Sequence, residues 1–567
     1  MAGGWMKTIF YNGRVYTGEE PEEQAFLVED GLFKAVGSDR EILSLGEPDT
    51  LLLDLEGRFV CAGFNDSHMH LLGFGQSLLE ARLSEHTGNL SEMLEYLKEY
   101  AASHPPREGR WLLGRGWNQD YFSDSSRMPD RSDLDAVSTE YPILLTRACG
   151  HCAIANSITL RIAGITASTP SPDGGSIGTE DGEPDGRLYD NAIDLVKPFI
   201  PAPDKEELKN MIRSAVRELN SYGITSVQTD DYCVFRSIPW ETVNEAYREL
   251  KEGGELTVRV SEQANFAEED TLRRFIEAGN TTGTGDALFR IGPLKLLGDG
   301  SLGSRTAHLS RPYADSPDTC GFSLFRPEEL YRMISLAHKN GMQVAVHAIG
   351  DTCLDEVLDT FERVLRETPR DDHRHGVVHC QITRPDQLSR IKALNLHVYA
   401  QSVFLDYDNH IVEKRVGSEL ASTSYSWKTL LQSGVSVSNG SDCPVELPDV
   451  MRGIECAVTR TSLDGTGPYL PEEAFTIREA LDSYTIRGAE ASFEEKEKGL
   501  IKPGYLADFT VLERNPFEAE ERQLHYVKVH ACYLDGKCVF LTDSPAYTTA
   551  ALSLSGSAAR PSDGHCS

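Results

Sequence analysis

Phe59-Val-Cys-Ala-Gly-Phe-Asn-Asp-Ser-His68-Met-His70 is the stretch of sequence from which the rest of the chain can be interpreted. Its apolar start, Phe59 to Cys61, predicts a strand, and Gly63 to Asp66 mark the point where that strand should stop. At the end of a strand, side chains at positions i and i+2 point to the same side, so both imidazoles can reach one ion. Histidine is the commonest neutral ligand of zinc and similar metals. The alternative interpretation is a surface histidine pair beside a turn.

Charge and cysteine content limit the class of protein. The 567 residues carry a formal net charge of -33, which argues against nucleic acid or an anionic membrane as a partner, because both attract basic surfaces. The first residues, Met1-Ala-Gly-Gly-Trp-Met-Lys7, lack the apolar segment of a signal peptide, and no stretch reaches the ~18 apolar residues of a membrane span. The 12 cysteines are scattered, which favours reduced thiols. We therefore expect a cytoplasmic protein.

Short strands around turn-forming dipeptides mark both ends of the chain. Asn12-Gly13 and Asp30-Gly31 predict turns between strands near the N-terminus, and Asp535-Gly536 predicts one near the C-terminus. Because both ends show short strands around turn-forming dipeptides, the sequence predicts one small β domain built from residues 1–64 and 496–541. The Ser/Ala/Thr-rich residues 542–567 have no periodicity and are predicted to be disordered.

Residues 75–203 form an irregular, strand-poor region. A helix is predicted at 90–101, strands at 111–117 and 141–147, and a loop at 171–175. We interpret the region as an insertion after the first strand that caps the site, within a larger domain spanning residues 65–495.

From Asp204 onward, predicted helices and strands alternate. The strands lie at 224–229, 256–260, 289–297, 343–347, 376–379, 396–399 and 435–438. With the strand before His68 they make eight, and such alternation is typical of parallel strands joined by crossover helices. Eight repeats predict an α/β fold of the TIM-like (β/α)8 barrel type, whose active site lies at the C-terminal ends of the strands.

Metal-competent side chains recur at the ends of these predicted strands. Taken singly, each has an ordinary explanation as a core or capping histidine, a snorkelling lysine or a turn aspartate. A chance distribution of histidines would not follow the strand ends, so the set predicts a metal site. Its members are His68, His70, Lys295, His347, His379 and Asp442.

Five motifs resemble the amidohydrolase superfamily, specifically its YtcJ-like (amidohydrolase 3) branch, which includes N-substituted formamide deformylase. The resemblance extends over residues 7–541, and the closing Lys502-Pro-Gly-Tyr-Leu-Ala-Asp-Phe509 resembles the family's return to its β domain. The motifs are Gly63-Phe-Asn-Asp-Ser-His-Met-His70, Lys295-Leu-Leu-Gly-Asp-Gly-Ser-Leu-Gly-Ser-Arg-Thr-Ala307, Val344-Ala-Val-His-Ala-Ile-Gly-Asp351, Val377-Val-His379 and Asn439-Gly-Ser-Asp442.

The resemblance implies a metal-dependent TIM-like barrel hydrolase and a role for each strand-end residue. His68, His70 and Asp442 would hold one divalent metal, with zinc expected, and His347 and His379 would hold a second or orient the substrate. Lys295 could bridge two metals as an N-carboxylated lysine. Asp442 and His347 are the catalytic candidates, and Asp442 is the natural general base, because a carboxylate beside an activated water can take its proton and pass it to the leaving amine.

The implied reaction is hydrolysis of a non-peptide C–N bond, in an amide or N-substituted formamide, by a metal-activated water. A metal-dependent isomerase, deaminase or decarboxylase on the same fold remains an alternative. A catalytically inactive assembly protein is a further one, although such relatives would be expected to lose ligands and all six positions are occupied here. The expected partner is a small amide-type substrate, and a homodimer is left open.

Four residues are candidates for substrate binding. Asp299 and Arg305 bound a Gly-rich loop that resembles a family substrate loop; a phosphate cradle is the alternative, but no P-loop Lys-Ser/Thr ending follows. His151 lies in Cys149-Gly-His-Cys152, which a redox site would also explain, although no thioredoxin-sized domain surrounds it. Trp117, with Tyr121 and Phe122, either lines the pocket or belongs to the core of the insertion.

Overall fold

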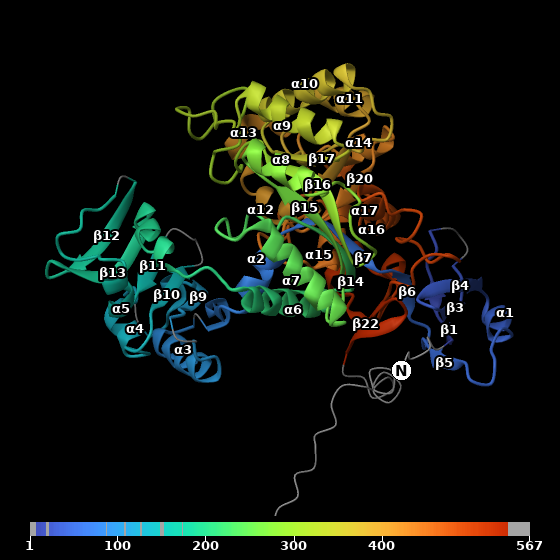
Figure 1. Ribbon diagram of the computed structural model, residues 1–567, viewed down its shortest axis with the longest axis horizontal. Helices are drawn as coiled ribbons and strands as arrows, with labels where there is room; N and C mark the ends of the chain where they lie inside the picture. The colour runs from blue at the N-terminus through green and yellow to red at the C-terminus, as the bar shows by residue number, and fades with distance from the viewer. Residues whose placement is uncertain are drawn as a thin grey trace, which may run out of the picture. The chain divides into compact units, whose positions relative to one another are not determined.

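The computed structural model describes residues 7–18, 22–86, 88–106, 109–124, 127–147, 152–172 and 174–542 (Figure 1). The chain divides into two compact units, one formed by Met1–Gly73 with Ala215–Ser567 and the other by Phe74–Ser214. Cys149, His151 and all but the first residue of the predicted disordered tail 542–567 fall outside the described residues.

The first unit contains a parallel sheet of eight strands. The two end strands of this row are joined where Ser438 Oγ donates to Ser67 Oγ over 2.9 Å and the Asp442 amide donates to the His68 carbonyl over 2.8 Å. The sheet is therefore a nearly closed barrel, and the predicted TIM-like fold is confirmed. In spatial order the strands are β7 (Phe64–Met69), β14 (Ile224–Thr229), β15 (Arg259–Asn265), β16 (Phe289–Leu297), β17 (Val344–Ala348), β18 (Gly376–His379), β19 (His397–Ala400) and β20 (Val437–Asn439).

Crossover helices cover the outside of this barrel (Figure 1). Helix α10 shows why they do so, because Leu354, Val357, Leu358, Phe361 and Val364 are all buried and repeat at helical spacing, which gives one apolar stripe. The main barrel helices are α7 (Trp240–Glu252), α8 (Glu269–Glu277), α9 (Pro327–Lys339), α10 (Asp351–Glu367), α11 (Pro385–Ala393), α14 (Trp427–Gln432) and α15 (Val450–Thr459).

The first predicted strand is in fact two strands in different sheets, so the expectation that it stops at Gly63 to Asp66 is wrong. Gly63 N–H donates to the Asp508 carbonyl (2.9 Å), whereas Phe64 N–H donates to the Gly223 carbonyl (3.0 Å). A Cβ at position 63 would lie 2.1 Å from Oγ1 of Thr225, so only glycine allows this change of partner. The chain then continues as β7, which carries His68 into the barrel.

Strands from both chain ends share a five-stranded sheet in the first unit, which contains β2 (Arg14–Val15), β6 (Phe59–Ala62), β21 (Phe509–Leu512), β22 (Val529–Leu534) and β23 (Lys537–Leu541). A four-stranded sheet contains β4 (Leu32–Gly37), β3 (Ala25–Glu29), β1 (Thr8–Tyr11) and β5 (Leu51–Asp54). Aromatic rings from the two sheets pack together: the ring centroids of Phe10 and Phe509 are 5.0 Å apart, and those of Phe10 and Tyr533 are 5.2 Å apart.

Two of the three predicted turns join adjacent strands of these sheets. Asp30-Gly31 connects β3 to β4 and Asp535-Gly536 connects β22 to β23, with positive φ at all four residues, as tight hairpin turns require. Asn12-Gly13 does not make a hairpin, because the strands it connects, β1 and β2, belong to different sheets. The division of the chain into a β domain and a barrel domain at the expected boundaries remains a prediction.

The second unit is built around a six-stranded sheet, so the strand-poor expectation for this region is wrong. The sheet order is β12 (Gly175–Glu180), β13 (Glu183–Asp190), β11 (Cys152–Ala155), β10 (Ile143–Arg147), β9 (Leu112–Trp117) and β8 (Ala81–Arg82). The predicted strands at 111–117 and 141–147 are confirmed as β9 and β10, but β12 and β13 are rich in glycine and charged residues, for example Glu183-Pro-Asp-Gly-Arg-Leu-Tyr-Asp190, so hydrophobic patterning does not detect them. The predicted helix is confirmed as α3 (Leu90–Ser103).

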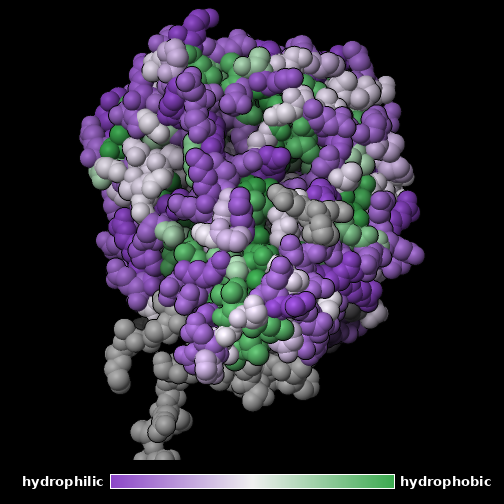
Figure 2. Space-filling model, turned by 90° about the vertical axis from the view of Figure 1, so that its right-hand side faces the viewer, coloured by the Kyte–Doolittle hydropathy of each residue, from purple (hydrophilic) through white to green (hydrophobic). Residues whose placement is uncertain are grey.

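Hydrophilic side chains predominate on the face of the molecule drawn in Figure 2, where hydrophobic side chains are confined to a narrower band. Within the described ranges, no helix combines the length and apolar character needed to cross a membrane. The cysteines that the structure describes are all free thiols.

Candidate metal centre

Every strand of the barrel supplies a polar side chain at or near its C-terminal end, where parallel barrels carry their sites. In strand order these are His68 and His70 from β7, Asp230 after β14, Gln263 in β15, Lys295 in β16, His347 in β17, His379 at the end of β18, Gln401 after β19 and Asp442 after β20.

His68, His379 and Asp442 form the central cluster. Each offers one ligand atom, and these atoms all lie within 4.8 Å of one another. Asp442 Oδ1 lies 3.3 Å from Nε2 of His68 and 3.2 Å from Nε2 of His70. The predicted ligands at the two ends of the barrel sheet, which lie more than 370 positions apart in sequence, are thus brought together by the near closure of β7 on β20.

The imidazoles are held by their Nδ1 atoms, which leaves Nε2 available. His68 Nδ1 lies 2.8 Å from Oε1 of Gln263, and His379 Nδ1 lies 2.7 Å from Oε1 of Gln401. Both amides are themselves oriented, because their Nε2 groups donate to the carbonyls of Ser67 (3.1 Å) and Tyr399 (3.0 Å). Since the amide oxygens only accept, Nδ1 carries the proton and the Nε2 lone pair is free to bind a metal.

The donor set fits a divalent metal. Asp442 Oδ1 is buried with no hydrogen-bond partner among the described residues, although it lies between two Nε2 atoms. A buried carboxylate oxygen without a partner is strongly unfavourable, so this arrangement is explained by a cation that the oxygen would bind. Two neutral imidazoles and a carboxylate are ligands that zinc and similar metals accept.

A buried carboxylate fixes the loop that carries Asp442. Asp66, in β7, accepts hydrogen bonds from the Ser441 amide (3.1 Å) and from Ser441 Oγ (2.5 Å). Burial raises the pKa of Asp66 to about 7, against the effect of these hydrogen bonds. Gly440 allows the close approach, because a Cβ there would lie 2.6 Å from the His68 amide nitrogen and 2.7 Å from Asp66 Oδ1.

The surroundings of the cluster shift the pKa values of its side chains in different directions. Burial lowers the pKa of His68, and burial together with the neighbouring His347 holds the pKa of His379 well below its usual value. Burial also acts to lower the pKa of His70, but the neighbouring carboxylate of Asp442 outweighs it and the pKa is raised well above the usual value. Burial would raise the pKa of Asp442, but the imidazoles of His68 and His70 beside it outweigh burial and hold the pKa well below its usual range. Two of the imidazoles are therefore neutral, as metal ligands must be.

The ammonium group of Lys295 is paired with a carboxylate, because its Nζ lies 3.4 Å from Oδ2 of Asp230. Both side chains are almost completely buried, with 1% and 0% exposure, and Asn265 Nδ2 donates to the same Oδ2 over 2.9 Å. Burial would raise the pKa of Asp230, but the charges of Lys295 and His70 more than offset this and the pKa is lowered. The pair is a buried ion pair inside the barrel mouth.

His347 is held in the opposite sense to the other imidazoles. Its Nε2 lies 3.0 Å from the Gly300 carbonyl and 3.3 Å from Oδ1 of Asp299, so Nε2 carries the proton and Nδ1 is the acceptor. Its ring centroid lies 4.4 Å from that of His379. Asp299 also accepts from the amides of His308, Ile349 and Gly350 and is buried, so its carboxylate acts on the site through His347.

The other predicted substrate-binding residues are Arg305, Trp117 and His151. Arg305 forms an ion pair with Asp315 over 3.0 Å. Trp117 has 0% exposure in the core of the second unit, and its Nε1 donates to the Leu145 carbonyl over 3.2 Å, which fits the alternative of a core residue. His151 lies outside the described residues. Substrate contacts by these residues remain predictions.

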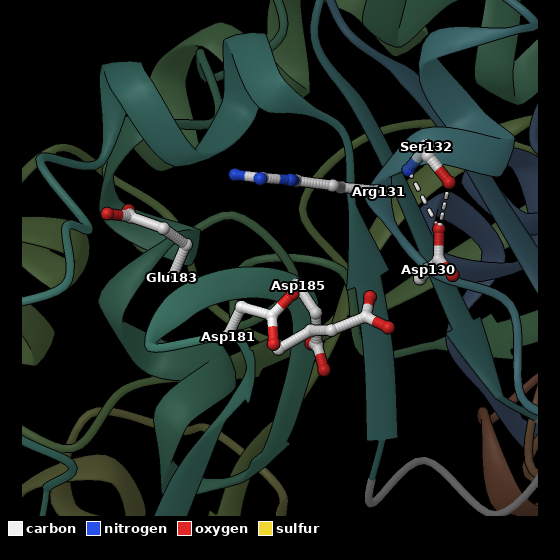
Figure 3. Close-up of a pocket in the computed structure, with 7 residues that line it drawn as sticks. Asp130, Arg131, Ser132, Asp181, Glu183 and Asp185 are labelled. Atoms are coloured by element: carbon white, nitrogen blue, oxygen red, sulfur yellow. Dashed lines mark hydrogen bonds between the residues drawn. The ribbon is translucent and has the colours of Figure 1, made fainter.

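A pocket in the second unit is lined mainly by acidic residues (Figure 3). Its volume is about 260 Å³. Asp185 is engaged by Arg187 over 2.5 Å, and Asp130 accepts from both the amide and the hydroxyl of Ser132. These carboxylates are satisfied by their own neighbours, and the metal-competent clusters found among the described residues lie in the barrel.

Comparison with known proteins agrees with this geometry. A family model described as "Amidohydrolase family" matches residues 52–540. The putative amidohydrolase YtcJ of Bacillus subtilis (strain 168) is 33% identical over 543 residues, covering 94% of this chain and 99% of the relative. The N-substituted formamide deformylase of Arthrobacter pascens is 27% identical over 534 residues, covering 90% of this chain and 94% of the relative.

A solved structure is also similar to this chain over most of its length. The crystal structure of an uncharacterized metal-dependent hydrolase from Pyrococcus furiosus aligns with a TM-score of 0.75 at 29% identity, covering 90% of this chain and 100% of that one. The family model extends over most of the chain, and the Bacillus relative is aligned over nearly its whole length. The chain therefore belongs to the amidohydrolase family of metal-dependent hydrolases.

Proposed function

We propose that this chain hydrolyses a non-peptide C–N bond of a small amide, and that N-substituted formamides are the first substrate class to test. The observation that carries the proposal is the convergence of two neutral imidazoles on the unpartnered Oδ1 of Asp442 at the mouth of the barrel. The amide class is supported by the relative from Arthrobacter pascens, whose name specifies formamide deformylation.

His68, His379 and Asp442 would hold the divalent metal, with zinc as the expected ion. When bound, such an ion polarises the scissile carbonyl and lowers the pKa of water to near neutrality. Gln263 and Gln401 keep the two imidazoles in the tautomer that binds metal. The buried carboxylate of Asp66 keeps the Asp442 loop in place through Ser441.

Asp442 is the proposed proton carrier. Its carboxylate takes the proton of the attacking water and returns it to the nitrogen of the leaving amine, so that one residue acts as base and then as acid. Its lowered pKa keeps the carboxylate ionised. His347 is proposed to orient the substrate by accepting a hydrogen bond at Nδ1, because Asp299 and the Gly300 carbonyl occupy Nε2.

N-carboxylation of Lys295 remains a prediction. The modification would replace an ammonium group with an anion 3.4 Å from the carboxylate of Asp230, and two such anions require neutralisation by cations. Mass spectrometry of the intact protein does not decide the question if the adduct is labile, so the chemical shift of ¹³C-labelled carbon dioxide bound to the protein is the appropriate measurement.

The test of the function is a substrate screen with the zinc-loaded protein, using N-substituted formamides, N-acyl amines and cyclic amides. We expect release of formate or another carboxylate from at least one class, and loss of this activity in His68→Ala. A matched control is His410→Ala, at a partly exposed position outside the central cluster. Failure of every amide class with fully loaded protein, or equal activity in His68→Ala, would contradict the proposal.

A further inference from the structure

The His68-Met-His70 motif is held by the residues that follow the neighbouring strand, β14. The Asp230 amide donates to the carbonyl of Met69, the residue between the two histidines, over 2.9 Å. His70 Nδ1 in turn donates to the Asp230 carbonyl over 2.9 Å, because a carbonyl oxygen can only accept. The motif is thus tied to the backbone of Asp230 through one backbone bond and one side-chain bond.

Helix α2 (Leu71–Leu78) begins immediately after this motif, and side chains from the end of β14 satisfy its first amides. The Leu71 amide donates to Oγ1 of Thr229, and the Leu72 amide donates to Oδ1 of Asp231, over 2.8 Å in each case. The first amides of a helix have no partner within the helix, so acceptors from outside fix where the helix begins. Thr229 and Asp231 therefore cap α2 from another strand, at the point where the chain leaves the first unit.

Asp231 is itself held on several sides and has 1% exposure. Its Oδ1 also accepts from Oγ1 of Thr229 over 2.9 Å, and its Oδ2 accepts from the hydroxyl of Tyr247 in α7. Its amide donates to Oε1 of Glu262 in β15 over 3.0 Å. Asp231 thus joins the start of α2 to both β15 and α7.

One peptide group connects Glu262 to the imidazole of His70. The carbonyl of the Asp230–Asp231 peptide accepts from His70 Nδ1, and the amide of the same peptide donates to Glu262 Oε1. This peptide cannot rotate without breaking one of the two bonds, so Glu262 fixes the acceptor that selects the tautomer of His70. In the neutral ring the proton on Nδ1 leaves the lone pair at Nε2, which lies 3.2 Å from Asp442 Oδ1.

Placing the acidic side chain of Glu262 in the protein interior lowers stability. Glu262 has 0% exposure, and its Oε2 has no hydrogen-bond partner among the described residues. Burying a carboxyl oxygen without a compensating partner is unfavourable. Departures of this kind are expected where a functional site requires them, and the bonds that lead from Glu262 to His70 supply such a requirement.

We propose that Asp231 and Glu262 are positioning residues, which hold the His68-Met-His70 motif in the geometry that binds metal. Both act through other residues: Asp231 through the start of α2, and Glu262 through the Asp230–Asp231 peptide. The inference concerns the metal centre and does not require that the chain hydrolyse an amide.

The test compares the Zn²⁺ affinity of the metal-free protein, measured by competition with a chromophoric chelator, with its unfolding in urea. We expect Asp231→Ala to weaken Zn²⁺ binding by about 10- to 100-fold, the usual effect of losing a residue that orients a metal ligand. Asp231→Asn should keep most of the affinity, because its side-chain oxygen can still accept from Leu72 and Thr229. If Asp231→Ala does not fold, Thr229→Val serves as the test variant, since it removes the acceptor of the Leu71 amide and should also weaken Zn²⁺ binding.

Asn220→Ala is the matched control at the opposite end of β14. Asn220 has 1% exposure, and its Nδ2 donates to the carbonyls of Ile224 and Thr257 over 3.1 Å each. Its loss should lower the free energy of unfolding and leave the Zn²⁺ affinity unchanged. An unchanged affinity in the test variant, or an equal loss of affinity in Asn220→Ala, would show that Asp231 only stabilises the fold and would overturn the proposal.

A pair of variants tests Glu262. Glu262→Gln keeps an oxygen that can accept from the Asp231 amide and should keep the Zn²⁺ affinity, whereas Glu262→Met has a side chain of similar length without that acceptor and should lower it. Equal Zn²⁺ affinities in the two variants would overturn the role of Glu262. A protein that shows these differences but hydrolyses no amide would support the positioning role and contradict the proposed function.

Discussion

His379 donates from Nδ1 to Oε1 of Gln401 over 2.7 Å, and the amide of Gln401 is fixed in turn by donating to the Tyr399 carbonyl. The same arrangement holds His68 against Gln263. The protein therefore uses neutral amides, rather than carboxylates, to select the tautomer of two histidines. Asp442 therefore supplies the negative charge of the central cluster, because the partners of its two histidines are neutral.

The first prediction concerns Gln401. Replacing it with alanine removes the acceptor for His379 Nδ1 and allows the other tautomer, in which Nε2 carries a proton and cannot bind metal. We expect Gln401→Ala to weaken metal binding by about 10- to 100-fold, the usual effect of losing such a support. Competition with a chromophoric chelator measures the change.

Gln387→Ala is the matched control for Gln401→Ala. Gln387 is also a buried glutamine, but its amide donates to the Asp351 carbonyl and to Asp355 in the outer helices. Gln387→Ala should lower the free energy of unfolding without changing metal affinity. Equal metal affinity in the two variants would show that Gln401 does not act through His379.

The second prediction concerns Asp442. Asn at this position keeps the size and an oxygen ligand but cannot act as a base. Asp442→Asn should retain much of the metal and lower turnover by at least ~100-fold, the lower limit for loss of general base catalysis. Nearly normal turnover with full metal content would exclude Asp442 as the base. Complete loss of metal would require solvent isotope effects on a partially active variant to separate the two roles.

The third prediction concerns Gly440. An added Cβ would lie 2.6 Å from the His68 amide nitrogen, so Gly440→Ala must displace either β7 or the Asp442 loop. We expect a loss of about 1–3 kcal/mol in the free energy of unfolding, typical of overpacking a buried site, together with a lower metal content. Gly303→Ala is the control, because nothing lies within 4 Å of its added Cβ. Similar unfolding curves for the two variants would contradict the close approach of Gly440 to the His68 amide nitrogen.

The fourth prediction concerns three histidines far from the metal centre. His375 accepts from the Val344 amide at Nδ1 (3.0 Å) and lies 2.8 Å from His338 Nδ1, whose other nitrogen faces the Thr368 carbonyl. Burial lowers the pKa of His338 and holds that of His375 well below the usual value. Burial and the nearby Arg370 lower the pKa of His373 to about 4.

Because these pKa values are lower in the folded than in the unfolded protein, the unfolded chain binds more protons in acid. The stability that they contribute is present above the unfolded pKa of about 6.5 and is lost as the pH falls below it. His373→Gln should therefore flatten the dependence of the unfolding free energy on pH between about 6.5 and 4, by up to ~1.4 kcal/mol per pH unit. Urea denaturation over this range measures the slope. His410→Gln is the control. An unchanged slope in His373→Gln would contradict the conclusion that His373 is buried in its neutral form.

The sequence predicted the barrel because most of its strands are apolar and lie between amphipathic helices. Strands at 224–229, 289–297 and 376–379 are confirmed without change. The sequence predicts the third strand at 256–260, whereas the strand is Arg259–Asn265, because its middle, Ser261-Glu262-Gln263, is polar yet buried. Hydrophobic patterning cannot detect a strand that faces a polar barrel interior, and Gln263 was missed for that reason.

The metal-competent histidines were predictable because histidine recurs at the ends of successive predicted strands, and Asp442 because Asn439-Gly-Ser-Asp442 resembles a family motif. Asp230 and Gln401 were not predicted, since aspartate and glutamine after a strand are ordinary turn residues. Their role depends on neighbours across the barrel, such as Lys295 beside Asp230. The pairing of β7 with β14 was the missing information, because it places Asp230 beside Met69.

The central claim is that the Nε2 atoms of His68 and His379, with Asp442, hold a divalent metal, and elemental analysis tests it most directly. Protein purified without chelator should contain one or two equivalents of a transition metal, zinc above all, and His379→Ala should contain less. Less than about half an equivalent of any transition metal, with no activity gained when metals are added, would contradict the account.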